Sequence, residues 1–378
     1  MPTAADGEEG GMSEIIIPWF GPELGTPERD RVAAVIASNY INDGSVTREF
    51  EQHIAELVGC RYCVAVTSGT VAISLALLAL GIGPGDEVLV PDLTFVATAN
   101  AARMIGAKVK LVDVEPRRFT IDVDKAAAAI GPDTRAIIPV DVNGRGADYD
   151  ALCALGQAKH LRIVCDAAEG LGSKYRGRAI GSFGDAACFS FSASKTVTSG
   201  QGGIVATNSE SVYFRLRELK DQGRRHGGSG GDDLHPMMGF NFKYTNIQAA
   251  IGLAQLDRFE QRIAHFAERD SWYRELLSNC PGITFPPQPN WEGEVLQWTD
   301  VMCSDRPLVQ RALREAGIDA RAFWFPVHRQ EPYKAEDSEF PNSIEISQRG
   351  LWLPSSFSLT RSEAERVSQV VRRALETG

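Results

Sequence analysis

The sequence lacks features that several classes of protein require. No apolar run approaches the ~18 consecutive residues that a membrane-spanning helix needs. Basic residues are outnumbered by acidic ones, 39 to 49, and the net charge of −10 argues against nonspecific binding to nucleic acid. No DNA-binding module is recognisable either. We therefore expect a protein whose partners are neither membranes nor nucleic acids.

The first residues lack the marks of a targeting peptide. The segment 1–11 is polar and acidic, contains glycine, and has neither a basic patch nor an apolar stretch. We expect residues 1–12 to form a disordered leader, because such a segment has little apolar surface to bury.

The seven cysteines do not form the pattern of a disulfide framework. Their number is odd and they are scattered through strand-like segments, which is typical of a reducing compartment, so we expect a cytoplasmic protein. Cys60 and Cys63 have the CxxC spacing of redox and zinc sites, but no second cysteine pair or histidine pair accompanies them. We predict no metal site and interpret both cysteines as small core residues.

Lys195 lies in a run of small hydroxyl and glycine residues that extends from Ser190 to Gly203. Such a run lets backbone amides approach an anionic phosphate and leaves room for a planar ring. A lysine amine attacks an aldehyde only when it is unprotonated, so a Schiff-base lysine must be partly desolvated or close to other cations. These features predict that Lys195 binds pyridoxal phosphate (PLP) covalently.

Asp166 follows the apolar run 161–165, as a carboxylate at the carboxyl end of a buried strand would. A carboxylate there can keep the pyridine nitrogen of PLP protonated, which turns the ring into an electron sink. Taken singly, Asp166 could be a helix N-cap and Lys195 a solvated loop residue. Their occurrence together favours a PLP site.

Apolar runs alternate with helical patterns along the chain, which predicts an α/β fold with a mostly parallel sheet and helices on both faces. The predicted strands are 63–67, 87–90, 108–112, 136–140, 162–165, 186–190 and 203–207. A predicted helix over 71–80 follows Ser68, Gly69 and Thr70. The amides at its start could bind an anion, and a simple capped turn is the alternative.

Residues 246–279 carry apolar side chains near helical spacing and predict one long amphipathic helix. We expect this helix to link two domains, because the chain is long enough for two cores. The predicted division is a large PLP-binding domain over 13–258 and a smaller C-terminal α+β domain over 259–378.

Six segments, taken as an ordered set, resemble motifs of the DegT-type sugar aminotransferases. They are 68–70, 91–100, 166–169, 190–203, 239–246 and 325–328. The likeness extends from about Ile17 to the C-terminal helix, and Glu169 with the stretches 195–198 and 328–333 is most similar to the GDP-perosamine synthases. The resemblance implies the aspartate aminotransferase fold (fold type I), whose large domain holds a mostly parallel seven-stranded sheet.

The resemblance also implies roles for individual residues. Lys195 would form the Schiff base and later shuttle a proton, while Asp166 would hold the pyridine nitrogen. Glu169 would lie near the phenolic oxygen of the cofactor or near the substrate, or it is only a helix-start carboxylate. Phe95 would stack on the ring, or it is only a core residue.

Phosphate binding is implied for Ser68, Gly69, Thr70, Ser190 and, from a partner subunit, Asn241. The expected assembly is therefore a homodimer with shared active sites. His328 resembles a family residue close to the sugar, although it could equally be a satisfied core or surface histidine.

Basic residues elsewhere could bind the rest of the substrate. The glycine- and arginine-rich stretch 223–231 could clamp a pyrophosphate, or it is an ordinary solvated loop. Arg321 could serve the same purpose. Two positions depart from the family pattern: Gln201 stands where many relatives carry Glu, and the segment 141–144 replaces a commoner one that contains His. Both could alter which sugar fits.

The implied activity is a ping-pong transamination. L-Glutamate would convert PLP to pyridoxamine phosphate, and a nucleotide-linked 4-keto-6-deoxy sugar would take the amino group, for surface polysaccharide or glycoside biosynthesis. GDP-4-keto-6-deoxymannose is the first choice of acceptor, and UDP- or dTDP-linked ketosugars, keto-acid sugars and ketocyclitols are alternatives. A PLP-dependent sugar dehydratase is a further alternative, which Lys195 argues against because such relatives carry His there. The last alternative function is that of a regulatory protein that binds PLP without turnover.

Overall fold

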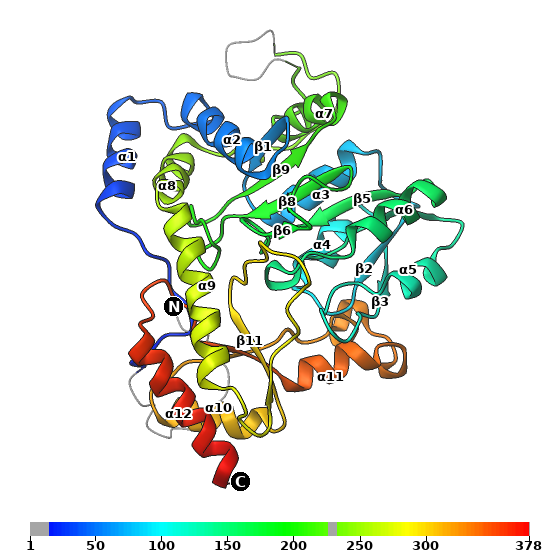
Figure 1. Ribbon diagram of the computed structural model, residues 1–378. Coiled ribbons are helices and arrows are strands. Elements are labelled where there is room, and N and C mark those ends of the chain that lie inside the picture. The colour runs from blue at the N-terminus through cyan, green and yellow to red at the C-terminus, as the bar shows by residue number, and fades with distance from the viewer. Residues whose placement is uncertain (1–14, 226–232, 378) are drawn as a thin grey trace.

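The computed structural model describes residues 15–225 and 233–377 of the chain (Figure 1). The predicted leader over residues 1–12 lies outside the described residues. Among the helices of these two ranges, none is both long and apolar enough to cross a membrane.

A seven-stranded sheet forms the centre of the larger part of the molecule (Figure 1). Its order is β1-β9-β8-β5-β4-β2-β3. The strands are β1 (Tyr62–Val66), β2 (Glu87–Pro91), β3 (Lys108–Val112), β4 (Thr134–Ile137), β5 (Arg162–Asp166), β8 (Ala186–Ser190) and β9 (Gly203–Thr207). Neighbouring strands are parallel except where β9 pairs with β1 and β8. The predicted α/β fold with a mostly parallel seven-stranded sheet is confirmed.

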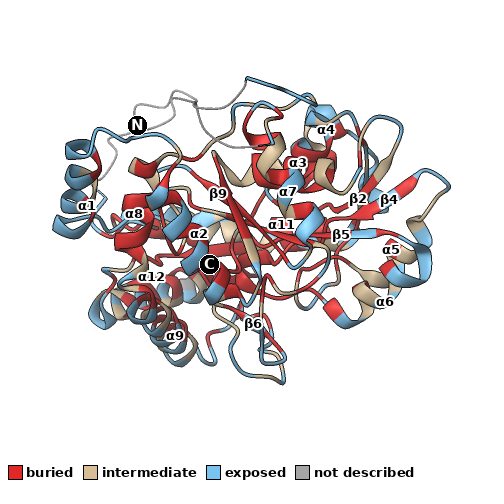
Figure 2. Cartoon of the chain, turned by 90° about the horizontal axis from the view of Figure 1, so that it is seen from above, coloured by how far each residue is buried: buried red, intermediate tan, exposed pale blue. Residues whose placement is uncertain are grey.

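Helices cover both faces of this sheet, because successive strand side chains point to opposite sides. Cys63 and Ala65 face one core cluster, whereas Val64 and Val66 face the other. The first cluster includes side chains of α2 (Ser45–Val58), α5 (Val123–Ala129), α6 (Tyr149–Lys159) and α8 (Asn246–Leu256). The second includes α3 (Gly69–Ala79), α4 (Ala97–Met104) and α7 (Glu210–Lys220). Figure 2 shows buried strands between helices whose outer faces are exposed.

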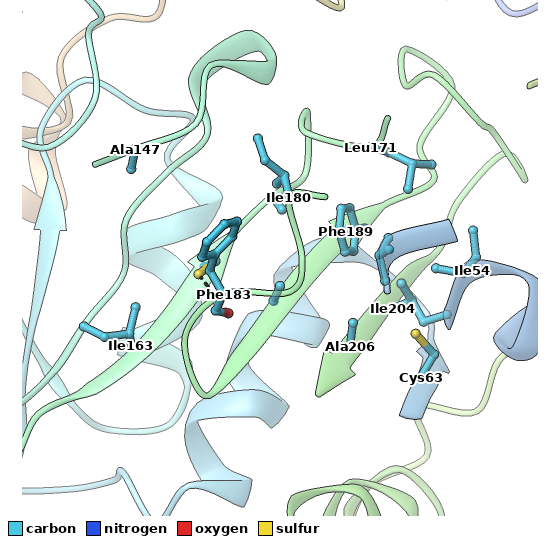
Figure 3. Packing of buried hydrophobic residues seen from close by; sticks show 14 of the residues in the cluster. Ile54, Cys63, Ala147, Ile163, Leu171, Ile180, Phe183, Phe189, Ile204 and Ala206 are labelled. Atoms are coloured by element: carbon cyan, nitrogen blue, oxygen red, sulfur yellow. Dashed lines mark hydrogen bonds between the residues drawn. The ribbon is translucent and has the colours of Figure 1, made fainter. Parts of the chain in front are cut away.

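The first cluster also explains the two cysteines. Figure 3 shows Cys63 of β1 among Ile54 and Ile204 in the packed interior. Cys60 is partly buried against the same cluster, and the interpretation of both as core residues is confirmed. Within the described residues, no group of three or more metal-ligating side chains is assembled.

A second, smaller sheet lies below the first in Figure 1 and has the order β10-β11-β13-β12. Its strands are β10 (Ile283–Thr284), β11 (Thr299–Cys303), β12 (Arg321–Ala322) and β13 (Gly350–Leu353), all antiparallel. The helices of this region are α9 (Phe259–Leu276), α10 (Arg306–Glu315), α11 (Pro341–Arg349) and α12 (Arg361–Thr377). Ile17, which precedes α1 (Thr26–Ala37), bridges to Ile318 and packs in the core of this region. The remaining short elements are η1 (Val142–Gly144), β6 (Lys174–Tyr175), β7 (Arg178–Ala179), η2 (Val327–Arg329), η3 (Glu331–Tyr333) and η4 (Asp337–Glu339).

An aromatic cluster joins the two sheets. Trp298 and Trp352 of the smaller-sheet region pack with Trp19, and Leu93 and Val140 reach the same cluster from the loops after β2 and β4. The loops at the carboxyl ends of the large sheet therefore rest on side chains of the small one.

The prediction of one helix over 246–279 is wrong. The segment forms two helices, α8 and α9, because Arg258 leaves the helical region with φ −112° and ψ 14°. Its guanidinium binds the carboxylates of Glu23 and Glu28 in the N-terminal part of the chain. The spacing of apolar residues indicates which face of a helix is buried, but it does not indicate where one residue with non-helical backbone angles interrupts the helix. The predicted domain division at residue 258 coincides with this break and stays a prediction.

Candidate active site

A cavity of about 310 Å³ lies at the carboxyl ends of the central strands. In open α/β sheets this edge is where ligands bind. The large sheet contributes residues that follow β1, β2, β4, β5 and β8, and the smaller-sheet region contributes Trp298, Arg321 and Trp324. The predicted residues that line it are Ser68, Gly69, Thr70, Phe95, Asp166, Glu169, Ser190, Lys195, Gln201 and Arg321. Residues as far apart in the chain as Ser68 and Trp324 thus line one cavity.

Lys195 and Glu169 form an ion pair inside this cavity. Lys195 Nζ lies 3.1 Å from Glu169 Oε1, and the two side chains are only 13% and 7% exposed. The ring of Trp298 lies on another side of the amine, with its centroid 5.3 Å from Nζ. The amine is therefore desolvated as a Schiff-base lysine requires, and its charged neighbour is a carboxylate rather than a cation.

Asp166 ends β5 and is buried. Its carboxylate accepts hydrogen bonds from Thr98 Oγ1 at 2.6 Å and from the backbone N–H of Ala168 at 3.1 Å. Burial raises the pKa of Asp166, and these two hydrogen bonds oppose that rise. Within the described part of the chain both donors are neutral, so a bound cation would complete the environment of this carboxylate.

The start of α3 forms a narrow cradle. The hydroxyl oxygen of Ser68 accepts the N–H of Val71, which places Gly69 and Thr70 in the first turn of an 11-residue helix. A Cβ on Gly69 would lie 3.0 Å from Ser190 Cβ, and a Cβ on Gly203 would lie 2.3 Å from the carbonyl oxygen of Ser68. The backbone contact at Gly203 allows only glycine, whereas a side chain at Gly69 would require Ser190 to shift slightly. The positive end of the helix dipole faces the cavity as an anion site.

PLP matches this set of groups. Its phosphate suits the start of α3, its aldehyde suits the amine of Lys195, and its ring nitrogen suits the buried carboxylate of Asp166. Phe95 is 54% exposed and lines the same cavity, where its ring is free to stack on a planar ligand. The roles of these residues stay predictions that the geometry supports.

The segment that departs from the family pattern also reaches the site. Asp141 lines the cavity, and burial raises its pKa to about 7. Its carboxylate accepts the hydroxyl of Tyr149 at 2.6 Å and the N–H of Ala147 at 3.1 Å. Asp141 is therefore held by hydrogen bonds that sequence reasoning missed.

The structure does not bring His328 into the cavity. Its side chain is fully buried, and Nδ1 lies 2.7 Å from Asp92 Oδ2 while the backbone N–H donates to Asp92 Oδ1. The ring stacks on Phe340 at a centroid distance of 4.5 Å. His328 thus connects η2 to the residue that follows β2. The sequence left two interpretations of His328 open, a sugar contact and a buried core histidine, and this placement favours the core histidine.

Two other predicted groups lie away from the cavity of their own chain. Asn241 is exposed, and its backbone bridges to Asp221. Of the basic stretch 223–231, residues 226–231 lie outside the described residues, and Arg224 pairs with Asp233 at 3.2 Å.

Thr98, Trp298 and Asn143 are site residues that sequence reasoning missed. Thr98 lies in the segment 91–100 that carried the resemblance, so its hydroxyl was the one available signal. Asn143 lies in the departing segment 141–144, which the sequence connected only with the choice of sugar. Trp298 carried no signal, because its contact with Asn143 spans 155 residues of chain.

A model of the DegT/DnrJ/EryC1/StrS aminotransferase family matches residues 22–372. The chain belongs to this family. As a DegT-family aminotransferase it uses PLP, in agreement with the cavity described above.

Relatives of this DegT-family aminotransferase agree with the assignment. It is 36% identical to a GDP-perosamine synthase of Caulobacter vibrioides, over 94% of this chain and 97% of that one. The structure of DesV from S. venezuelae is similar with a TM-score of 0.88 and 32% identity, covering 92% and 94% of the two chains. DesI, solved in the presence of its TDP-sugar product, has a TM-score of 0.87 and 30% identity, covering 94% and 91%.

Proposed function

We propose that this aminotransferase transfers the amino group of L-glutamate to a 4-keto-6-deoxy sugar linked to GDP, with GDP-4-keto-6-deoxymannose as the acceptor and GDP-perosamine as the product. The observation that supports this substrate most is the 36% identity to a GDP-perosamine synthase across nearly the whole of both chains. The proposal includes a cytoplasmic location, which the seven free cysteines support.

Each cavity residue would have a separate role in such a reaction. When bound, PLP supplies the electron sink that stabilises negative charge beside the transferred nitrogen. Asp166 would hold the proton on the ring nitrogen, and the start of α3 with Ser190 would hold the phosphate. Lys195 Nζ, once free, would move the proton that each half-reaction transfers. Glu169 would keep that amine in place, since its Oε1 lies 3.1 Å away.

A two-step absorption experiment tests the proposal. L-Glutamate is added to the PLP-loaded protein and removed, then GDP-4-keto-6-deoxymannose is added, and the visible band of bound PLP is followed. We expect the band to disappear and then return. If the band disappears and does not return, the protein is an aminotransferase but GDP-4-keto-6-deoxymannose is not its acceptor. If glutamate has no effect on the band, L-glutamate is not the amino donor.

A TDP-linked ketosugar is the second candidate acceptor, because DesI is 30% identical over 94% of this chain and was solved with its TDP-sugar product. Adding the TDP-linked ketosugar in the second step of the same experiment distinguishes the two. The acceptor that restores the band at the lower concentration is the better substrate.

Arg321 is suited to bind the anionic part of the acceptor. Its guanidinium lies 5.1 Å from the ring centroid of Trp19 and 5.8 Å from that of Trp352. Arg321 lines the cavity, and among the described residues it forms no ion pair. An arginine held on two aromatic rings with its hydrogen-bond donors free is suited to a pyrophosphate.

We expect Arg321→Ala to raise the KM for the sugar nucleotide by about 10- to 100-fold, because a charge-assisted hydrogen bond contributes about 1.5–3 kcal/mol. The KM for glutamate should not change. Steady-state kinetics with each substrate varied in turn measures both, and Arg311→Ala on the exposed side of α10 is the matched control. A rise in the glutamate KM instead would assign Arg321 to the donor carboxylate.

We also propose that two chains form a dimer with shared sites, in which Asn241 binds the phosphate of the partner subunit's PLP. Asn241 is exposed and does not line the cavity of its own chain, which supports this arrangement.

Lys195→Ala and Asn241→Ala should each be inactive alone and regain activity when mixed. In a mixed dimer one site has an intact Lys195 and receives an intact Asn241 from the other chain. Random pairing makes half of the dimers mixed, so about a quarter of wild-type activity should return. Co-expression with two different affinity tags isolates the mixed dimer, and its inactivity would contradict a role for Asn241 across the interface.

A further inference from the structure

Asn143 touches the ion pair at Lys195 from outside the cavity. It lies in η1, is fully buried, and does not line the cavity. Its backbone N–H donates to Glu169 Oε2 at 2.8 Å, while the other oxygen of that carboxylate faces Lys195 Nζ at 3.1 Å. The orientation of Glu169 is therefore shared between Asn143 and Lys195.

The side chain of Asn143 binds the smaller-sheet region. Its Nδ2 donates to the carbonyl oxygen of Trp298 at 2.6 Å and to Asp300 Oδ1 at 2.5 Å, and its Oδ1 accepts the N–H of Trp298 at 2.7 Å. Both amide hydrogens and the amide oxygen are thus used. Trp298 is the residue whose ring lies 5.3 Å from Lys195 Nζ, so one asparagine holds both groups that flank the amine.

The backbone at this point is shaped for that contact. Asn143 has φ +56°, a left-handed conformation that asparagine tolerates better than most residues. A Cβ on the following residue, Gly144, would lie 2.1 Å from the carbonyl oxygen of Val295, so the loop before β11 passes directly against η1. The neighbouring Asp300 is buried and ion-paired with Arg145, which also anchors β11 to this segment.

We propose that Asn143 is a positioning residue that sets the orientation of Glu169 and Trp298 around Lys195 and thereby makes the geometry at the amine depend on the position of β11. This inference rests on the proposed roles of Lys195 and Glu169 and requires no particular sugar substrate. The segment 141–144, which departs from the family pattern, would then orient the groups around the Lys195 amine.

The test measures charge stabilisation at the amine without any turnover. The visible band of the PLP-loaded protein is titrated against pH in wild type and in Asn143→Gly, a change that removes the side-chain anchors without strain at φ +56°. The other charged groups that line the cavity with Lys195 are Glu169, Asp166, Asp141 and Arg321, and Arg145 and Asp300 lie behind Asn143. A loosened Glu169 stabilises positive charge on the nitrogen less, so the titration midpoint should fall by about one pH unit.

A double-mutant cycle tests whether Asn143 changes the titration midpoint through Glu169. Glu169→Gln should itself lower the midpoint, and Asn143→Gly added to it should lower the midpoint no further. Asn279→Gly is the matched control, because Asn279 is also left-handed, with φ +55°, and is exposed in the smaller-sheet region.

A lower melting temperature of Asn143→Gly with an unchanged midpoint would overturn the proposal, since a purely structural role predicts that result. An undiminished shift in the Glu169→Gln background would also overturn it. If Asn143→Gly does not fold, Asn143→Ser, whose hydroxyl fills part of the vacated space, takes the same titration with the same criteria. Because no acceptor is added, a wrong sugar assignment leaves the outcome untouched.

Discussion

Replacing Lys195 with alanine is expected to abolish amino transfer, lowering kcat by about 10⁴-fold or more. In the proposed mechanism the variant lacks both the group that would bond PLP covalently and the base that would move the proton. Lys195 is the only lysine among the described residues that line the cavity, so no neighbour can take over. Coupled assays of 2-oxoglutarate release from L-glutamate measure the loss. Retained transamination in the variant would contradict the mechanism.

The fold of this variant should survive. Glu169 keeps the hydrogen bond from the N–H of Asn143 after the amine is gone, so its carboxylate is not left without a donor. Circular dichroism and the melting temperature check this expectation. Lys159→Ala, on the exposed surface of α6, is the matched control and should behave as wild type.

Small primary amines provide a stricter test of the same role. If Lys195 acts through its Nζ, methylamine can enter the space that the side chain vacates and restore part of the proton transfer. Rescue should depend on amine concentration in Lys195→Ala and be absent in wild type. Its absence would mean that the covalent bond matters more than the proton transfer.

The parts of the site that the sequence predicted are those whose chemistry is local. Lys195 stands in a run of small residues, and Asp166 ends an apolar strand, so each carries its signal within a few neighbours. The strands could be predicted equally well. β3, β8 and β9 have the predicted bounds, β2 and β5 extend one residue beyond them, and β1 and β4 begin and end earlier than predicted. A continuous apolar run such as 203–207, which is buried throughout, reports burial directly.

Other features depend on contacts that no local pattern records. His328 has the residue type of a ligand contact, yet Asp92, 236 residues away, turns it into a buried anchor. The importance of Asn143 comes from its hydrogen bonds to Trp298, which precedes β11, and to Asp300 of β11. The break between α8 and α9 likewise follows from the ion pairs of Arg258 with the N-terminal segment. The sequence predicted candidate reactive groups and did not indicate the residues that contact them.

Asp166→Asn is expected to lower kcat by about 10²- to 10³-fold while Lys195 still binds PLP. The amide keeps the size of the side chain. Its one oxygen can still accept the N–H of Ala168 while its NH2 group donates to Thr98 Oγ1, so the local structure should hold. It loses the negative charge that, in the proposed mechanism, would keep a proton on the ring nitrogen, and the ring would then withdraw electrons less well. Single-turnover absorption after adding L-glutamate measures the rate of the first half-reaction directly.

The matched control for this variant is Asp185→Asn, because Asp185 precedes β8, the neighbouring strand, at the end of the sheet far from the cavity. Its loss can lower the melting temperature but should leave the half-reaction rate unchanged. Burial raises the pKa of Asp166 in the chain without cofactor, so the apo protein should bind a proton at this carboxyl more readily than an exposed aspartate does. A positively charged ring nitrogen placed against it reverses that preference. PLP should therefore bind Asp166→Asn more weakly than wild type, and equal affinity together with a normal rate would show that another group pairs with the ring nitrogen.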